Sequence, residues 1–315
     1  MLDMSPGQVE VDLEPEREPV EPARRGVLWK HLKRSKVGIA GFLITGTFVL
    51  LAMVSPYLPF LADPAAQDLD ARLVPPVGWG GSWDHPLGTD QLGRDLLARI
   101  ISGGRVSMLV GLSAVAIAAL VGITLGLIAG YRGGGVDTGI MSVADVQIAF
   151  PGVLAGLILV AAFGPGVILV VVVIAMSGWM VFTRVTRSLV LSLKTSLFVE
   201  AGELSGTKPR RIMRMHLLPN LYSSLVTLAV LEFAAAILSE SAFSFLGFGV
   251  QPPGASWGLI IAQGRTYVTS AWWIVTFAGC AIAIAVLGTN LIALWLQSFG
   301  DVGERERTIL ETPRT

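Results

Sequence analysis

Two carboxylates interrupt a long apolar run of this sequence, and they are the residues that could do chemistry there. Glu232 lies near the middle of the run at about 221–243, and Glu240 follows eight residues later. On a helix the directions of these side chains differ by about 80°. A carboxylate in mid-membrane costs about 2.5–3.5 kcal/mol on insertion scales, so each is expected to face a cavity or a partner. With Ser244, they are candidates for a polar path through a membrane.

Two other interpretations of these carboxylates stay open. A protonated Glu232 that hydrogen-bonds a neighbouring helix would stabilise packing, and this explains Glu232 as well as a path does. For Glu240 the path or its gate is favoured, because hydroxyl side chains flank it. Both could also be the proton sites of a proton-coupled secondary carrier. Such a carrier predicts inverted repeats with matching broken helices, which the sequence does not show.

Motifs for bound cofactors do not occur in the chain. There is no G-x-x-x-x-G-K-[ST] loop for ATP and no H-E-x-x-H motif for zinc. The three histidines, His31, His85 and His216, lie on separate segments. We therefore expect no catalytic, cofactor-binding or metal site, and no enzyme activity. Any use of ATP would require partner subunits.

The charged stretch Glu200–Asn220 lies between two apolar runs. The sequence predicts a helix over 190–204, a break at Gly206 with positive φ, and a second helix with Pro209 in its first turn. Thr207 is the expected cap, and Pro219 is expected to end the second helix. Glu200 and Glu203 are expected to pair locally with the nearby cations. With its flanks the stretch carries seven basic residues: Arg184, Arg187, Lys194, Lys208, Arg210, Arg211 and Arg214.

The composition predicts an all-α polytopic membrane protein. Hydrophobic residues make up 53 % of the chain, charged residues only 15 %, and the mean hydropathy is +0.67. Soluble domains carry about 25 % charged residues. The apolar runs are about 20 residues long, which is enough to cross a bilayer. Six transmembrane helices are expected, at about 37–55, 107–130, 146–163, 166–183, 221–243 and 272–296.

The distribution of basic residues predicts the orientation. With the N-terminus inside, only five of the 23 Lys and Arg residues fall outside, namely Arg72, Arg94, Arg99, Arg105 and Arg265. Both termini are then cytosolic. The expected organisation is a cytosolic tail at 1–36, a first transmembrane helix at 37–55, an extracytoplasmic segment at 56–106, a five-helix core at 107–299 that contains the cytosolic loop 188–219, and a cytosolic tail at 300–315.

Three further expectations concern packing. From Asp90 to about residue 106 the pattern predicts an amphipathic helix along the outer interface, with Arg94 and Arg99 on its polar side. Gly122, Gly126 and Gly130 recur every fourth residue and predict a close helix–helix contact. The single cysteine, Cys280, lies in an apolar run and is expected to be a small buried side chain.

The charged stretch resembles the cytosolic loop of the permease subunits of ABC importers. Glu200-Ala201-Gly202 take the positions of its EAA sequence, Gly206 takes that of its glycine, and Leu218-Pro219 take those of its Leu-Pro. Two positions depart from that pattern. Gly202 stands where the EAA sequence has its third residue, and His216 stands where the pattern has isoleucine. The resemblance implies that this loop, including Arg210, sits in a cleft of an ATPase subunit and converts its closure into pore opening.

Motifs in residues 85–258 are similar to the dipeptide/oligopeptide/nickel permease family, second-subunit type. They are HPLGTDQLGRDLLARIISGGRVS, GYRGGGVD, AFPG and SFLGFGVQPPGASWG. The end of the last span departs from the family, because Asn290-Leu291 is followed by IALWLQSFGDVGERE. The resemblance implies import of peptides across a prokaryotic plasma membrane. Its implied partners are a second permease, two ABC ATPase domains that hold ATP and Mg, a solute-binding protein and membrane lipid, with no nucleic acid.

Overall fold

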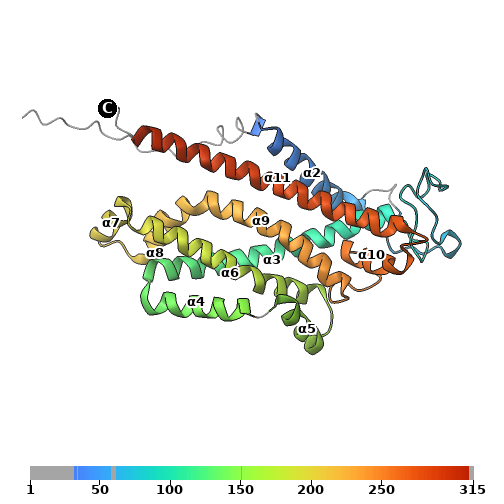
Figure 1. Ribbon diagram of the computed structural model, residues 1–315, viewed down its shortest axis with the longest axis horizontal. Coiled ribbons are helices and arrows are strands. Elements are labelled where there is room, and N and C mark those ends of the chain that lie inside the picture. The colour runs from blue at the N-terminus through green and yellow to red at the C-terminus, as the bar shows by residue number, and fades with distance from the viewer. Residues whose placement is uncertain (1–31, 34, 58–61, 150, 312–315) are drawn as a thin grey trace, which may run out of the picture.

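Long helices dominate the computed structural model, which describes residues 32–33, 35–57, 62–149 and 151–311 (Figure 1). No β-strand occurs among these residues. Five helices are long and apolar enough to cross a membrane, and a bent pair makes a sixth span if it counts as one. The all-α, polytopic prediction is therefore confirmed. The predicted tail 1–36 lies almost entirely outside the described residues.

The long helices are α2 (Lys36–Val54), α3 (Leu96–Arg132), α6 (Val167–Lys194), α9 (Leu218–Phe245) and α11 (Trp272–Glu311). Shorter ones are α4 (Gly134–Ala149), α5 (Gly152–Phe163), α7 (Leu197–Leu204), α8 (Pro209–Ile212) and α10 (Trp257–Gly264). Figure 1 shows α7 and the end of α11 at one end of the molecule, and α10 with the segment before α3 at the other. The helix α11 runs on into the predicted tail at 300–315.

The third predicted span, 146–163, is not one straight helix. The helices α4 and α5 meet at an angle of 82°, and Pro151 is the N-cap of α5. Proline cannot donate to the preceding turn, so the chain bends there. The helix α4 also begins earlier than predicted, at Gly134. Its aspartates, Asp137 and Asp145, both pair with arginines of α6.

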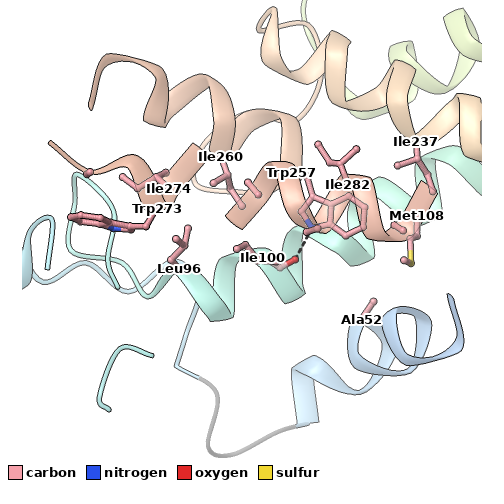
Figure 2. Packing of buried hydrophobic residues seen from close by; sticks show 14 residues of the cluster. Ala52, Leu96, Ile100, Met108, Ile237, Trp257, Ile260, Trp273, Ile274 and Ile282 are labelled. Atoms are coloured by element: carbon pink, nitrogen blue, oxygen red, sulfur yellow. Dashed lines mark hydrogen bonds between the residues drawn. The ribbon is translucent and has the colours of Figure 1, made fainter. Parts of the chain in front are cut away.

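Among the described residues no separate interfacial helix precedes the second span, so that expectation is wrong. The helix α3 starts at Leu96, where the Asp95 carboxylate accepts a hydrogen bond from the Ala98 N–H at 2.8 Å, and it runs unbroken to Arg132. Its first turns are buried, because α10 and α11 cover them. Figure 2 shows Trp257 of α10 in this cluster, and its indole N–H donates to the Ile100 carbonyl at 2.9 Å. Neighbours in the cluster include Leu96, Met108, Ile237, Ile260, Trp273, Ile274 and Ile282.

The predicted glycine contact between helices is confirmed on α3. Gly122, Gly126 and Gly130 face α6 so closely that an added Cβ would press against its backbone. A Cβ on Gly126 would lie 2.6 Å from the Thr183 carbonyl oxygen, and one on Gly130 would lie 3.1 Å from that of Arg187. Small residues allow such close approach in membranes. The helices α3 and α6 therefore form one tightly packed pair.

The prediction for Cys280 is wrong, because its side chain on α11 is exposed. An apolar run does not reveal which face of a membrane helix meets protein. Lipid is as apolar as a protein core, so both faces carry the same residue types.

Candidate coupling segment and transmembrane path

The loop that the sequence predicts to be cytosolic forms a bent pair of short helices, which we call the coupling segment (residues 197–217). The helix predicted over 190–204 is interrupted, since α6 ends at Lys194 and α7 begins at Leu197. Gly206 has φ +69°, as predicted. Pro209 starts α8, also as predicted, but the N-cap is Lys208 and no side chain bonds there. The expectation that Thr207 is the cap is therefore wrong.

Pro219 does not end the second helix. A π-turn at Met213–Leu217 joins α8 to α9, and Pro219 lies in the first turn of α9. Together these elements run from Pro209 to Phe245 as 37 helical residues. In an α-helix the ring of Pro219 would clash with the carbonyl of Met215, four residues earlier. The π-turn widens the helix at that point and allows the chain to continue.

One face of the coupling segment is packed against the membrane helices and the other is open. Val199, Ile212 and Leu217 are fully buried in a cluster with residues of α3, α6 and α9. On the open face Leu197 is 81 % exposed and Leu204 is 90 % exposed. These two leucines and the exposed cations around them are the side chains that this face offers to a partner protein. The segment is thus held from one side and free to bind on the other.

The seven basic residues do not form one exposed island. The Arg184 guanidinium pairs with Asp145 at 2.5 Å, and that of Arg187 binds both Asp137 carboxylate oxygens at 2.5 and 2.6 Å. Lys194 donates to the Tyr131 carbonyl at 2.7 Å. Four exposed cations remain: Lys208, Arg210, Arg211 and Arg214.

The predicted ion pairs within the coupling segment do not stabilise it either. No ion pair between Glu200 or Glu203 and these cations occurs among the described residues. Instead, the Glu203 carboxylate accepts a hydrogen bond from the Tyr131 hydroxyl at 2.9 Å. The other predicted coupling residues divide between surface and interior. Glu200, Ala201, Gly206, Arg210 and Pro219 are exposed, whereas Gly202 and Leu218 are half-buried.

The structure does not bring the three candidate path residues to one surface. Glu240 is 1 % exposed and Ser244 fully buried. The Ser244 hydroxyl donates to the Glu240 carboxylate at 2.7 Å inside the bundle. Glu232 is half-buried and borders a small cavity of about 100 Å³ between α3, α6 and α9. A role in a path stays a prediction for all three, although the contacts of Glu240 and Ser244 are those of a packing pair.

Sequence reasoning missed a buried charge cluster near the start of α3. The Arg94 guanidinium donates to the Asp90 carboxylate at 2.7 Å and to the Gln263 amide oxygen at 3.1 Å. Arg99 is fully buried, donates to the same Gln263 oxygen at 2.9 Å and lies 3.4 Å from Asp90. The spacing of Asp90 and Arg94 was a usable signal, but their partner Gln263 on α10 is distant in sequence.

A larger apolar cavity of about 740 Å³ lies between α4, α5 and α6, beside the bend at Pro151. Gln147 of α4 links two of these helices. It accepts a hydrogen bond from the Trp179 indole of α6 at 2.8 Å and donates to the Met176 carbonyl. This cavity was also missed, since no sequence pattern revealed the bend.

Comparison with known proteins decides the family. Residues 122–301 match the model of the "binding-protein-dependent transport system inner membrane component" family, and residues 25–76 match the "N-terminal TM domain of oligopeptide transport permease C". The chain belongs to this family of inner-membrane transport components. The resemblance to ABC importer permeases is thereby confirmed, and with it a place in the inner membrane.

Individual members of the family are similar along most of their length. The di/tripeptide transport system permease protein DppC of Pseudomonas aeruginosa is 39 % identical over 276 residues, which cover 87 % of this chain and 90 % of that protein. The dipeptide permease DppC of Alkalihalophilus pseudofirmus is 39 % identical over 84 % of this chain and 85 % of its own. The Bacillus subtilis DppC is 35 % identical over 85 % of this chain and 82 % of its own.

Proposed function

We propose that this permease is one half of the membrane pore of an ATP-driven importer of peptides, with both termini in the cytosol. The observation that carries the proposal is the coupling segment, which is packed on one side and presents exposed leucines and cations on the other. The names of the relatives support di- or tripeptides as the cargo. The partners would be a second permease, two ABC ATPase domains and a solute-binding protein.

The mechanism would be alternating access driven from the cytosolic end. The ATPase pair, which holds ATP and Mg, closes and displaces the coupling segment. Because this segment is continuous with α9 and packed on α3 and α6, those helices tilt with it. The pore then opens outward, receives the solute from its binding protein, and opens inward after hydrolysis. This chain contributes no catalytic group to the ATP reaction.

Gly206→Val is expected to weaken association with the ATPase about tenfold or more. No atom lies within 4 Å of a Cβ added at Gly206, so the effect would come from its φ of +69°, which a β-branched residue adopts only at a cost of about 1–3 kcal/mol. That cost would reshape the turn between α7 and α8. The measurement is co-purification of this chain with a co-expressed ATPase subunit.

Gly133→Val is the matched control for that experiment. Gly133 has φ +67° and equally open surroundings, but it lies between α3 and α4. Its substitution is expected to leave the ATPase bound. Equal loss of binding in both variants would assign the effect to general strain, and unaltered binding in Gly206→Val would contradict the proposed docking face.

The cavity beside Glu232 is the observation that favours the alternative function, a proton-coupled carrier. A carrier needs a solvent-reachable carboxylate, and Glu232 borders such a space. For the importer, ATP-dependent uptake is expected to continue in Glu232→Gln, since the charge takes no part in driving transport. For the carrier, pH-dependent uptake would continue without any ATPase and disappear in Glu232→Gln. Uptake into vesicles at several pH values, with and without the ATPases, separates the two.

A further inference from the structure

Tyr131, in the last turn of α3, is the meeting point of three helices. Its side chain is buried, with 8 % exposed. Its hydroxyl donates to the Glu203 carboxylate of α7 at 2.9 Å, and its carbonyl accepts from the Lys194 ammonium of α6 at 2.7 Å. The same ammonium lies 5.6 Å from the centroid of the Tyr131 ring. Lys194 therefore fixes both the backbone and the ring that present the hydroxyl to α7.

We propose that Tyr131 is the positioning residue that transmits displacement of the coupling segment to α3. The inference rests on the proposed function, because it assigns a route for force only if an ATPase moves this segment. It adds to the coupling motif, since neither Tyr131 nor Glu203 is one of the residues on which the resemblance to ABC permease loops was based.

The remaining contacts between the coupling segment and α3 differ in kind from this one. Val199 and Ile212 are buried in a cluster with Leu127 and Tyr131. Apolar contacts are non-directional, so such surfaces can slide over one another without losing much contact energy. A hydrogen bond to a carboxylate weakens steeply when its geometry changes. The Tyr131–Glu203 bond is therefore the contact that resists sliding.

Movement that reaches α3 would be passed on to α6 and α4. Gly122, Gly126 and Gly130 bring α3 against the backbone of α6, so neither helix can shift alone without losing that contact. The Arg187–Asp137 pair then ties α6 to α4. The helix α4 borders the 740 Å³ cavity. The chain of contacts thus leads from the coupling segment to an open space among the membrane helices.

The test uses the full transporter in proteoliposomes: both permeases, the ATPases and the binding protein, with dialanine as the probe. Tyr131→Phe removes only the hydroxyl and keeps the ring against Lys194. We expect assembly and thermal stability to stay unchanged, while ATP hydrolysed per dipeptide rises at least about fivefold, within the range of ordinary coupling energies. A residue that only supports the fold would instead reduce assembly or stability and leave this ratio unchanged.

Three further variants sharpen the result. Tyr222→Phe removes a hydroxyl from an exposed tyrosine of α9 and is expected to match the wild type. Glu203→Gln keeps an acceptor for the Tyr131 hydroxyl, so its ratio is expected to stay within about twofold of the wild type, whereas Glu203→Ala should behave like Tyr131→Phe. The double variant Tyr131→Phe/Glu203→Ala should be no worse than either single one, as expected for two ends of one interaction.

Three outcomes would overturn the inference, and the third is distinguishable from the first two. A wild-type ratio in Tyr131→Phe, or additive effects in the double variant, would refute the role of Tyr131 and leave the proposed function intact. A wild-type complex that shows neither binding-protein-stimulated ATP hydrolysis nor ATP-dependent uptake would refute the proposed function and, with it, this inference.

Discussion

Asp90→Ala is expected to destabilise the chain by about 3–5 kcal/mol, enough to prevent its accumulation in the membrane. Asp90 is the carboxylate that faces two buried guanidinium groups, Arg94 at 2.7 Å and Arg99 at 3.4 Å. Its other oxygen accepts the backbone N–H groups of Leu92 and Arg94 at 2.8 and 3.1 Å. Removal of one partner from a buried ion pair leaves an uncompensated charge, and this accounts for the size of the loss.

The measurement is the unfolding of the purified chain by SDS in mixed micelles. Asp70→Ala is the matched control, because it removes an exposed carboxylate of the same segment before α3 and is expected to change stability by less than about 0.5 kcal/mol. Adding Arg99→Met to Asp90→Ala should recover part of the loss, since one of the two stranded charges is then absent. Equal midpoints for Asp90→Ala and Asp70→Ala would show that the cluster does not hold α3 to α10.

This cluster also shows where prediction from the sequence ends. Hydropathy located the membrane helices, because the length and apolarity that let a run cross a bilayer do not depend on its contacts in the fold. Whether a charged side chain is buried depends on its partners, and these can be far away in the sequence. Arg94 and Arg99 lie 169 and 164 residues from Gln263, and were therefore expected at the polar surface.

The prolines illustrate a second limit. Pro151 and Pro219 both lie at or near a helix start in the sequence, yet the chain bends by 82° near the first and continues as a helix through the second. The difference is the π-turn at Met213–Leu217, which no residue pattern announced. Gly206, by contrast, was predictable, because positive φ at a helix end strongly favours glycine. Local backbone rules transferred well, and the contacts that modify them did not.

Gly126→Leu is expected to destabilise the chain by about 3 kcal/mol or more by separating α3 from α6. A Cβ at this position would lie 2.6 Å from the Thr183 carbonyl oxygen and 2.6 Å from the Thr186 Cβ. Neither atom is the end of a flexible side chain, so the helices must move apart. Overpacking of this kind costs about 1–3 kcal/mol, occasionally more, and the rest of a leucine adds to the clash. Gly126→Ala is expected to show a smaller loss in the same direction.

Gly46→Leu distinguishes this clash from the general effect of a larger residue in a membrane helix. Gly46 lies within α2, and a Cβ there meets no atom within 4 Å. Its substitution should leave unfolding in SDS unchanged or slightly harder, because leucine has the better helix propensity. If Gly126→Leu unfolds like Gly46→Leu, α3 and α6 are not a rigid pair, and movement at Tyr131 would have no fixed route into the bundle. The stability of this one contact therefore decides whether a displacement at Tyr131 would reach α3 and α6 as a unit.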